Sequence, residues 1–299
     1  MKLHTLNDIR DTIHRTHREG KVRGKSTGWA NVDELWTLGE GNLIVVTGIP
    51  SSGKSEVLDQ LSLHRAVLHD QHTTFFSPEN WPLEAHAQKF AEKYIGKPMW
   101  SQGLAGCISP EELDEAIDFC SEYITFLEPS DKELNVDALL MGLEESDKLH
   151  STDMFVLDPW NELENNPNKN ISVTHHISES LSKIRNFGRK HKIDMVIVAH
   201  PTKLKKNEDT GNYPIPTPYD ISDSANWRNK ADVCISVWRD YAMNDGVVEV
   251  HVQKIRNKNY GTLGYTKLYW NWCNGVFTSE KVNPGDGDRY AIRNKVVAL

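Results

Sequence analysis

This 299-residue sequence lacks several features, and their absence argues against several classes of protein. Its four cysteines include no C-x-x-C pair, so they offer no zinc module and fit reduced thiols in a cytoplasmic or other reducing compartment. No run approaches the roughly 20 apolar residues of a membrane helix, and the first residues form no apolar signal segment, so neither a membrane partner nor secretion is expected. The net charge of −8 argues against a generally basic nucleic-acid binder but leaves room for a local basic channel.

The most specific motif present is Gly48–Ser55, which has the G-x-x-x-x-G-K-S spacing of a phosphate-binding loop. It directly follows the apolar run Leu43–Val46 and precedes a helical pattern, which is the context that the motif requires. In such a loop, backbone N–H groups and the helix dipole favour phosphate. Lys54 is expected to reach the β- and γ-phosphates and Ser55 to bind Mg²⁺. The sequence therefore predicts that ATP or another NTP binds with Mg²⁺ through Gly48, Ser51, Ser52, Gly53, Lys54 and Ser55.

From about residue 26 onward, short apolar runs alternate with helical patterns. The early runs are β-branched and do not alternate, as in a parallel sheet covered on both faces. The later runs alternate and follow one another closely, which predicts an antiparallel extension. We expect one doubly wound α/β domain over residues 26–299 and a helical arm over residues 1–25. The expected strands are 43–47, 73–77, 123–127, 154–157, 195–199, 233–238, 247–253 and 265–271; helices are expected at 5–19, after the phosphate loop, at 82–93, from Ser109, and through 173–184.

The arm is expected to form a helix that Thr5 caps and Gly20 ends. Leu6, Ile9 and Ile13 form an apolar stripe that is too narrow to make a core by itself. We therefore expect this helix to dock on another surface, with the basic stretch 21–25 as a linker into the main domain.

Two acids end predicted strands. Asp158 follows Met154–Leu157, where it would hold the Mg²⁺ hydration shell beside Ser55, although an acid at a strand end also fits a simple turn. Glu79 follows the strand next along the chain after the phosphate-loop helix. If that strand neighbours the phosphate-loop strand, Glu79 lies near the γ-phosphate and could orient and deprotonate the attacking water. The alternative is a solvated loop acid that caps the helix at 82–93.

The remaining candidates follow the later strands. His200 is either a sensor of the γ-phosphate or a satisfied core histidine. Lys254 and Arg256 are two apart, so an extended chain points them to one side. One interpretation is that these two side chains lie at a solvated hairpin end. The other is that they form a pair of cations that contact a phosphate, as an arginine finger does. Residues 201–221 show no periodicity, and a loop of this length in a compact domain is usually functional or disordered.

These motifs occur in the order of the RecA-like, P-loop helicase domain of the DnaB family, and the chain resembles the Twinkle and T7-type branch most. The resemblance covers residues 25–299. Phe76–Asn80 is similar to the motif bearing the catalytic glutamate, Asp158 matches the Walker B acid, and Val198–Pro201 looks like the phosphate-sensing motif. Ser224 to Arg239 resembles the next motif. Lys254–Asn257 matches the segment whose arginine acts as a finger across the subunit interface.

The resemblance implies an ATP-dependent replicative DNA helicase that forms a ring, usually a hexamer, around single-stranded DNA. It implies that Arg239 and Tyr269 sandwich the adenine, that the arm docks on a neighbouring domain, and that DNA contacts lie in the loop 201–224. The candidate DNA contacts are Lys203, Lys205 and Lys206. A primase or a polymerase is a further candidate partner, in a phage, bacterial or organellar replisome, but primer synthesis itself is not expected. Two alternatives stay open: a RecA- or RadA-type recombinase, and a non-catalytic nucleotide-gated DNA clamp.

Overall fold

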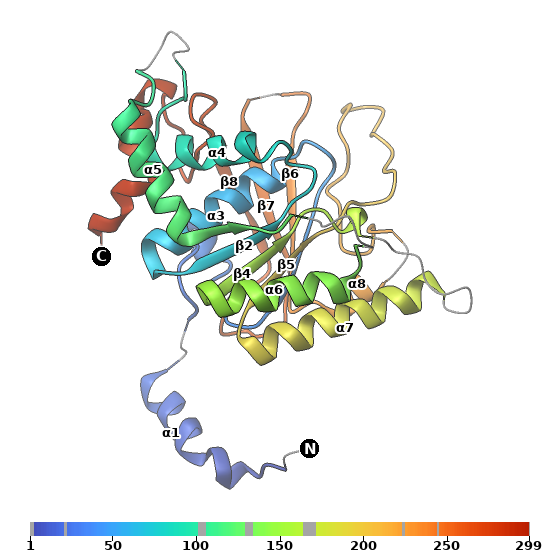
Figure 1. Ribbon diagram of the computed structural model, residues 1–299. Helices are drawn as coiled ribbons and strands as arrows, with labels where there is room; N and C mark the ends of the chain where they lie inside the picture. The colour runs from blue at the N-terminus through green and yellow to red at the C-terminus, as the bar shows by residue number, and fades with distance from the viewer. Residues whose placement is uncertain are drawn as a thin grey trace.

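The computed structural model describes residues 3–20, 23–100, 106–128, 134–163, 172–222, 225–243 and 245–298. Within these residues one nine-stranded sheet forms, in the order β3-β2-β4-β5-β1-β6-β7-β8-β9 (Figure 1). The strands from β3 to β6 are parallel, and β7 to β9 extend the sheet in antiparallel fashion. Their bounds are β1 (Leu43–Thr47), β2 (His72–Phe76), β3 (Ile124–Phe126), β4 (Thr152–Leu157), β5 (Asp194–Val198), β6 (Val233–Arg239), β7 (Val247–Ile255), β8 (Gly264–Trp270) and β9 (Phe277–Thr278).

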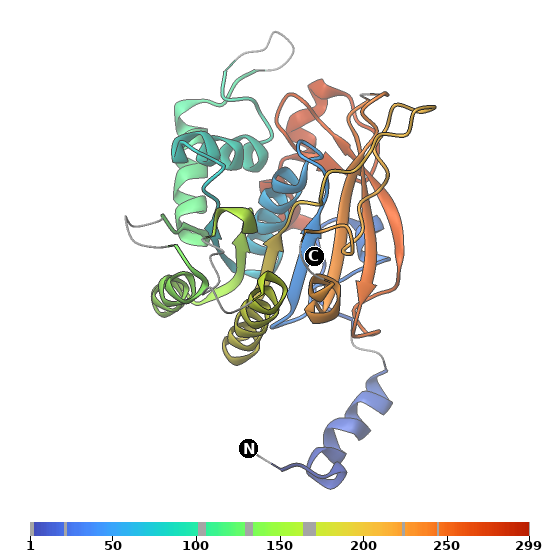
Figure 2. The same cartoon turned by 90° about the vertical axis from the view of Figure 1, so that its right-hand side faces the viewer.

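Helices cover both faces of the parallel part, because successive residues of each strand point to opposite sides. Ile44 and Val46 of β1 belong to one hydrophobic core, and Leu43 and Val45 belong to the other. The first core is shared with α2 (Ala30–Asp33), α3 (Lys54–His69), α4 (Leu83–Ile95) and α5 (Pro110–Tyr123). The second is shared with α6 (Val136–His150), α7 (Val173–His191) and α8 (Asn226–Lys230), and α6 and α7 run side by side in Figures 1 and 2. The doubly wound prediction is confirmed.

Local capping explains where several helices begin. The hydroxyl of Ser109 accepts a hydrogen bond from the Glu112 N–H at 3.2 Å, and the Glu112 carboxylate accepts one from the Ser109 N–H at 3.1 Å. Pro110 occupies the first helical position of α5, where no N–H is needed. The side chain of Asn135 caps α6 by accepting from the Ala138 N–H at 3.0 Å. Of these two helices, α5 was predicted from its capping residues and α6 was not.

One expectation about the sheet is wrong. The strand that follows the phosphate-loop helix, β2, is not the neighbour of β1, because β4 and β5 lie between them. Sequence order does not fix pairing order, since each crossover helix lets the chain pass over intervening strands. The ends of β2 and β4 are nevertheless joined: the Asp158 N–H donates to the Phe76 carbonyl at 2.9 Å. This bond places the segments after both strands at one edge of the sheet.

A buried ion pair ties α3 to the sheet. The Arg65 guanidinium lies 2.9 Å from the carboxylate of Asp194, and both side chains are at most 2% exposed. Asp194 also accepts a hydrogen bond from the Asn42 N–H at 3.0 Å. This pair fixes the helix that carries the phosphate loop against β5.

The N-terminal arm stands away from the sheet in both views (Figures 1 and 2). A 3-10 turn, Leu6–Ile9, leads into α1 (Arg10–Glu19), and Gly20 ends it with φ +79°. Thr5 begins the turn through hydrogen bonds to the Asp8 carboxylate. The predicted stripe is 44–77% exposed at Leu6, Ile9 and Ile13, so its docking on another surface stays a prediction. Residues 1–2 of the arm and 21–22 of its linker lie outside the described residues, as does Ser224.

None of the helices that the structure describes is both long enough and apolar enough to cross a bilayer.

Candidate nucleotide-binding site

The phosphate loop has backbone conformations at Gly48 and Gly53 that favour glycine. Gly48 and Gly53 have φ values of +154° and +96°, in the left-handed region. A Cβ at Gly48 would collide with the Val237 carbonyl oxygen near the end of β6. Ser51 also has a positive φ of 62°. The glycine spacing thus produces a concave loop whose backbone faces a pocket at the carboxyl end of the sheet.

Lys54 at the start of α3 is held inside this loop. Its Nζ donates to the carbonyls of Gly48 at 2.9 Å and Ile49 at 3.0 Å, and the residue is 5% exposed. Burial lowers the pKa of Lys54 to about 8, against the opposing influence of Asp158 and Glu79. Because the printed hydrogen bonds of Lys54 go to backbone carbonyls, the ammonium group can exchange them for phosphate oxygens.

Ser55 and Asp158 meet as predicted. The Ser55 hydroxyl donates to Asp158 Oδ2 at 2.5 Å, although the two residues come from α3 and from the segment after β4. Asp158 is 5% exposed, and burial raises its pKa, while the Ser55 hydrogen bond acts in the opposite direction. A hydroxyl and a carboxylate at one point are the oxygen ligands by which a nucleotide's Mg²⁺ is usually held.

Glu79 and His200 approach each other above this pair. Glu79 Oε1 lies 4.0 Å from His200 Nε2, although one follows β2 and the other β5. Burial, then Asp158 and Glu162, raise the pKa of Glu79, whose side chain remains 53% exposed. Burial and the charge of Lys54 lower the pKa of His200. The histidine is therefore neutral near pH 7 and sits within reach of the candidate base.

These side chains line one cavity of about 560 Å³, a size typical of small-molecule sites. Arg239 at the end of β6 also lines it, as expected for a residue that contacts the base. Tyr269 does not; its neighbour Trp270 does, together with Val248 and Phe277. Tyr269 thus lies outside this pocket of its own chain, because adjacent residues of a strand point to opposite faces, and its contact with the base stays a prediction. The aromatic side chains that line the pocket are those of Trp270 and Phe277.

Lys254 and Arg256 lie at the opposite end of the sheet. Lys254 pairs with Cys234 near the start of β6, whereas the pocket residue Val248 pairs with Arg239 at the end of β6. Neither cation contacts the pocket of its own chain. Both cations therefore lie apart from the nucleotide pocket of their own chain, and a finger role for them stays a prediction.

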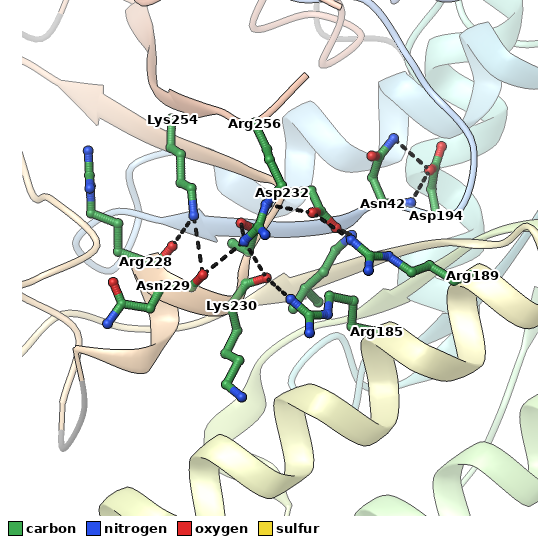
Figure 3. A network of polar contacts seen from close by, with 12 residues as sticks. Asn42, Arg185, Arg189, Asp194, Arg228, Asn229, Lys230, Asp232, Lys254 and Arg256 are labelled. Atoms are coloured by element: carbon green, nitrogen blue, oxygen red, sulfur yellow. Dashed lines mark hydrogen bonds and ion pairs between the residues drawn. The ribbon is translucent and has the colours of Figure 1, made fainter. Parts of the chain in front are cut away.

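Figure 3 shows what holds these two cations in place. Lys254 Nζ donates to the carbonyls of Arg228 and Asn229 at the end of α8. Arg256 donates to the carbonyls of Asn229 at 2.9 Å and Ala231 at 3.2 Å, and its Nε lies 3.0 Å from Asp232. The unpaired carbonyls at a helix end attract cations in this way. The predicted placement of both side chains on one side of the chain is confirmed.

The lysines predicted to contact DNA lie on the loop after β5, where Lys203, Lys205 and Lys206 are at the surface. All three are outside the nucleotide pocket, and the Nζ of Lys206 stands 5.1 Å from the ring centre of Tyr213. Nothing in their surroundings assigns a ligand to them, so DNA contact stays a prediction.

Besides the apolar and aromatic lining, three polar lining residues were not foreseen: Glu56, Asn80 and Lys89. Lys89 on α4 lies 2.9 Å from the Glu56 carboxylate and donates to the Asn80 side-chain oxygen at 3.2 Å. It thereby joins the phosphate-loop helix to the loop that carries Glu79. Only the position of Asn80 beside Glu79 gave a signal in the sequence; Lys89 belongs to the next helix and reaches the site through the tertiary fold.

The chain's own residues fit a magnesium nucleotide. Within the described residues, the buried Ser52 hydroxyl has no hydrogen-bond partner. It can therefore donate a hydrogen bond to a phosphate oxygen. The described residues contain no cluster of three or more histidine, cysteine, aspartate or glutamate ligands.

Comparison with known proteins adds an independent line of evidence. Residues 24–277 match the family model of the DnaB-like helicase C-terminal domain. The Twinkle homolog protein, chloroplastic/mitochondrial, of Arabidopsis thaliana is 33% identical over 298 residues, which cover 96% of this chain and 41% of that protein. The chain thus spans about two fifths of the length of this relative.

Two solved structures are similar in fold. A solved ATPase domain superimposes with a TM-score of 0.76 at 17% identity, over 94% of this chain and 100% of that one. A DnaB-like replicative helicase, described with its interactions with primase, gives a TM-score of 0.72 at 17% identity, over 92% of this chain and 67% of that one. The RecA-like fold predicted from the sequence is confirmed by these superpositions.

Proposed function

Because the chain belongs to the family of DnaB-like helicase C-terminal domains, we propose that it is the motor of an ATP-dependent replicative DNA helicase. In this proposal it hydrolyses ATP or another NTP at the subunit interfaces of a ring, usually hexameric, and translocates on single-stranded DNA. The observation that carries it is a divided site. Lys54, Ser55, Asp158 and Glu79 share one pocket, while Arg256 lies at the opposite end of the sheet.

The bound magnesium nucleotide supplies the phosphoryl group and neutralises part of its charge. Lys54 exchanges the carbonyls of Gly48 and Ile49 for phosphate oxygens, and Ser55 and Asp158 would hold the Mg²⁺. Glu79 accepts the proton of the attacking water. Its pKa is raised toward the operating pH, which is where the pKa of a general base is most effective. His200, next to Glu79 and to the long loop, relays the phosphate state.

Arg256, with Lys254, completes the site of the neighbouring subunit. To do so, the guanidinium must leave the carbonyls of α8 that now hold it. Stabilisation of transferring phosphoryl charge by such a finger is worth roughly 10³–10⁵ in turnover in other NTPases. An isolated subunit is therefore expected to hydrolyse ATP poorly.

On the other side of the pocket, Arg239 and Trp270, in place of Tyr269, hold the nucleobase. Lys203, Lys205 and Lys206 contact the DNA backbone, and the exposed stripe of the arm docks on the neighbouring domain. The compartment proposed is a reducing one, such as an organelle, because the four cysteines are free and the Arabidopsis relative is named chloroplastic/mitochondrial. A primase or polymerase is proposed as a further partner.

The test is the ATPase rate per chain against protein concentration, with and without single-stranded DNA, for wild type and Arg256→Ala. The proposal predicts a steep rise with concentration, stimulation by DNA, and loss of turnover with ATP binding retained in Arg256→Ala. A rate that is flat with concentration and indifferent to DNA and to Arg256 would reject it. Rings rather than filaments in electron micrographs distinguish it from a recombinase, and measurable turnover distinguishes it from a passive clamp.

A further inference from the structure

We infer that Tyr241 couples the phosphate loop to the lysine-bearing loop 201–222, so that nucleotide at one and DNA at the other influence each other. This inference rests on the proposed function, because it names how the two proposed ligands communicate. Tyr241 lies in the turn between β6 and β7 and does not line the nucleotide pocket.

The first contact joins Tyr241 to the phosphate loop. Its hydroxyl donates a hydrogen bond of 2.6 Å to the backbone carbonyl of Pro50, 191 residues away in sequence. The turn that presents the tyrosine is held by Asp240, whose Oδ1 accepts from the N–H groups of Ala242 at 2.8 Å and Met243 at 3.0 Å. A fixed turn aims the hydroxyl at a fixed point of the phosphate loop.

The second set of contacts joins the same turn to the lysine-bearing loop. The ring of Tyr241 meets the ring of Tyr213 edge to face, with centroids 6.4 Å apart and an interplanar angle of 82°. The Ala242 N–H also donates to the Asn212 side chain at 3.3 Å. Tyr213 is anchored in turn, because its carbonyl accepts from the indole N–H of Trp238 at 2.9 Å.

A cation stands at each end of this aromatic pair. Lys206 Nζ lies 5.1 Å from the ring centre of Tyr213, and the Arg239 guanidinium lies 5.8 Å from that of Tyr241. Arg239 lines the nucleotide pocket, and Lys206 is one of the lysines proposed to meet DNA. Cation–ring attractions of this kind depend on each ring staying beneath its cation. A shift of Tyr241 therefore changes its contact with Arg239 and, through Tyr213, the contact with Lys206.

The phosphate loop has a reason to shift at this point. Lys54 now bonds the carbonyls of Gly48 and Ile49, which directly precede Pro50. When Lys54 turns to phosphate, those carbonyls lose their cation, and the segment that Tyr241 grips is free to adjust. His200 begins the long loop, whereas the Tyr241 ring and the neighbouring Ala242 N–H contact its middle at Tyr213 and Asn212, so the two residues act at different points.

The experiment removes one oxygen atom. Tyr241→Phe keeps both aromatic contacts but deletes the hydrogen bond to Pro50, and Tyr265→Phe, an exposed tyrosine on β8 whose ring stacks on His251, is the matched control. ATP affinity and basal ATPase rate are expected to stay within about twofold of wild type. Stimulation by oligo-dT is expected to fall about two- to tenfold in Tyr241→Phe alone, the factor that the loss of one neutral hydrogen bond corresponds to.

A second readout separates this inference from the proposed helicase activity. Hydrogen–deuterium exchange of residues 201–222 is compared with and without a non-hydrolysable ATP analogue and Mg²⁺. We expect a nucleotide-dependent change in wild type and Tyr265→Phe that is lost or at least halved in Tyr241→Phe, even if DNA stimulates no variant. An equal response in all three proteins, or no response of this loop to nucleotide in wild type, overturns the inference while leaving ATP hydrolysis in a ring untouched.

Discussion

Replacing Trp270 with alanine should weaken nucleotide binding because the contact with the base is lost, while the contacts with the phosphates remain. Trp270 lines the pocket from the end of β8 and is 39% exposed, so part of the residue is covered by the protein and part remains open to a ligand. Its neighbour Tyr269 belongs to the opposite face of the same strand and does not line the pocket. The two substitutions therefore form a matched pair, one residue apart.

The magnitude follows from the exposed part of the ring. Stacking of a base on an aromatic side chain is worth about 1–3 kcal/mol by alanine substitution. Because only part of the Trp270 ring is open, we expect the lower half of this range, about 1–2 kcal/mol, or a Kd about 5- to 30-fold higher. Trp270→Phe, which retains a ring, should lose less. Tyr269→Ala should change the affinity less than about twofold, since surface substitutions away from a site usually cost under about 0.5 kcal/mol.

Isothermal titration with a non-hydrolysable ATP analogue and with tripolyphosphate, both in Mg²⁺, measures the two parts of the ligand separately. Trp270→Ala should lower affinity for the analogue and leave that for tripolyphosphate unchanged, because the phosphate loop is intact. The register argument is refuted if Tyr269→Ala weakens the analogue and Trp270→Ala does not. Equal losses for both ligands would mean that the substitution disturbs the pocket rather than the base contact.

Three further outcomes follow from the contacts described. Asp194→Asn leaves Arg65 charged and buried, and breaking such a pair costs about 3–5 kcal/mol. The free energy of unfolding measured in urea should therefore fall by about that amount. A decrease below about 1 kcal/mol would contradict this expectation. The pKa of Lys54 is lowered to about 8, and bound phosphate must raise it again, so nucleotide binding should take up a proton at about pH 9 but not at about pH 7. For the same reason, nucleotide affinity should fall as pH rises through this interval. Calorimetry in buffers of different ionisation enthalpy measures the proton uptake, and no uptake at about pH 9 would rule out a neutral lysine in the free loop. Glu79→Gln should lower turnover about 10²- to 10⁴-fold while ATP still binds; a variant that keeps more than a tenth of wild-type turnover would show that Glu79 is not the base.

Features coded by adjacent residues were predictable from the sequence. The phosphate loop depends on glycines at fixed spacing, and the capping of α5 by Ser109 depends on residues three apart. The strands ending near Asp158 and His200 were found because buried parallel strands are continuous apolar runs. Each of these signals is local, so a single sequence was enough.

Features that depend on pairing and register were not predictable in the same way. The position of β2 three strands away from β1 is decided by crossovers, which leave no local mark. The choice between Tyr269 and Trp270 depends on which face of a short strand meets the pocket, and a shift of one residue reverses it. Strand β9 has only two residues, too few for any periodic pattern. The contact of Lys89 with Asn80 exists only after α4 has packed beside α3.

The most direct test of the divided site is subunit mixing. Glu79→Gln keeps the finger but lacks the base, and Arg256→Ala keeps the base but lacks the finger, so each alone should turn over ATP at a small fraction of the wild-type rate. When the two are mixed, interfaces form that combine the Glu79 of one subunit with the Arg256 of the next. The account predicts that the mixture hydrolyses ATP well above the sum of the two variants, with a maximum near equal amounts. A mixture no more active than that sum, or an Arg256→Ala variant as active as wild type, would contradict a site shared between subunits.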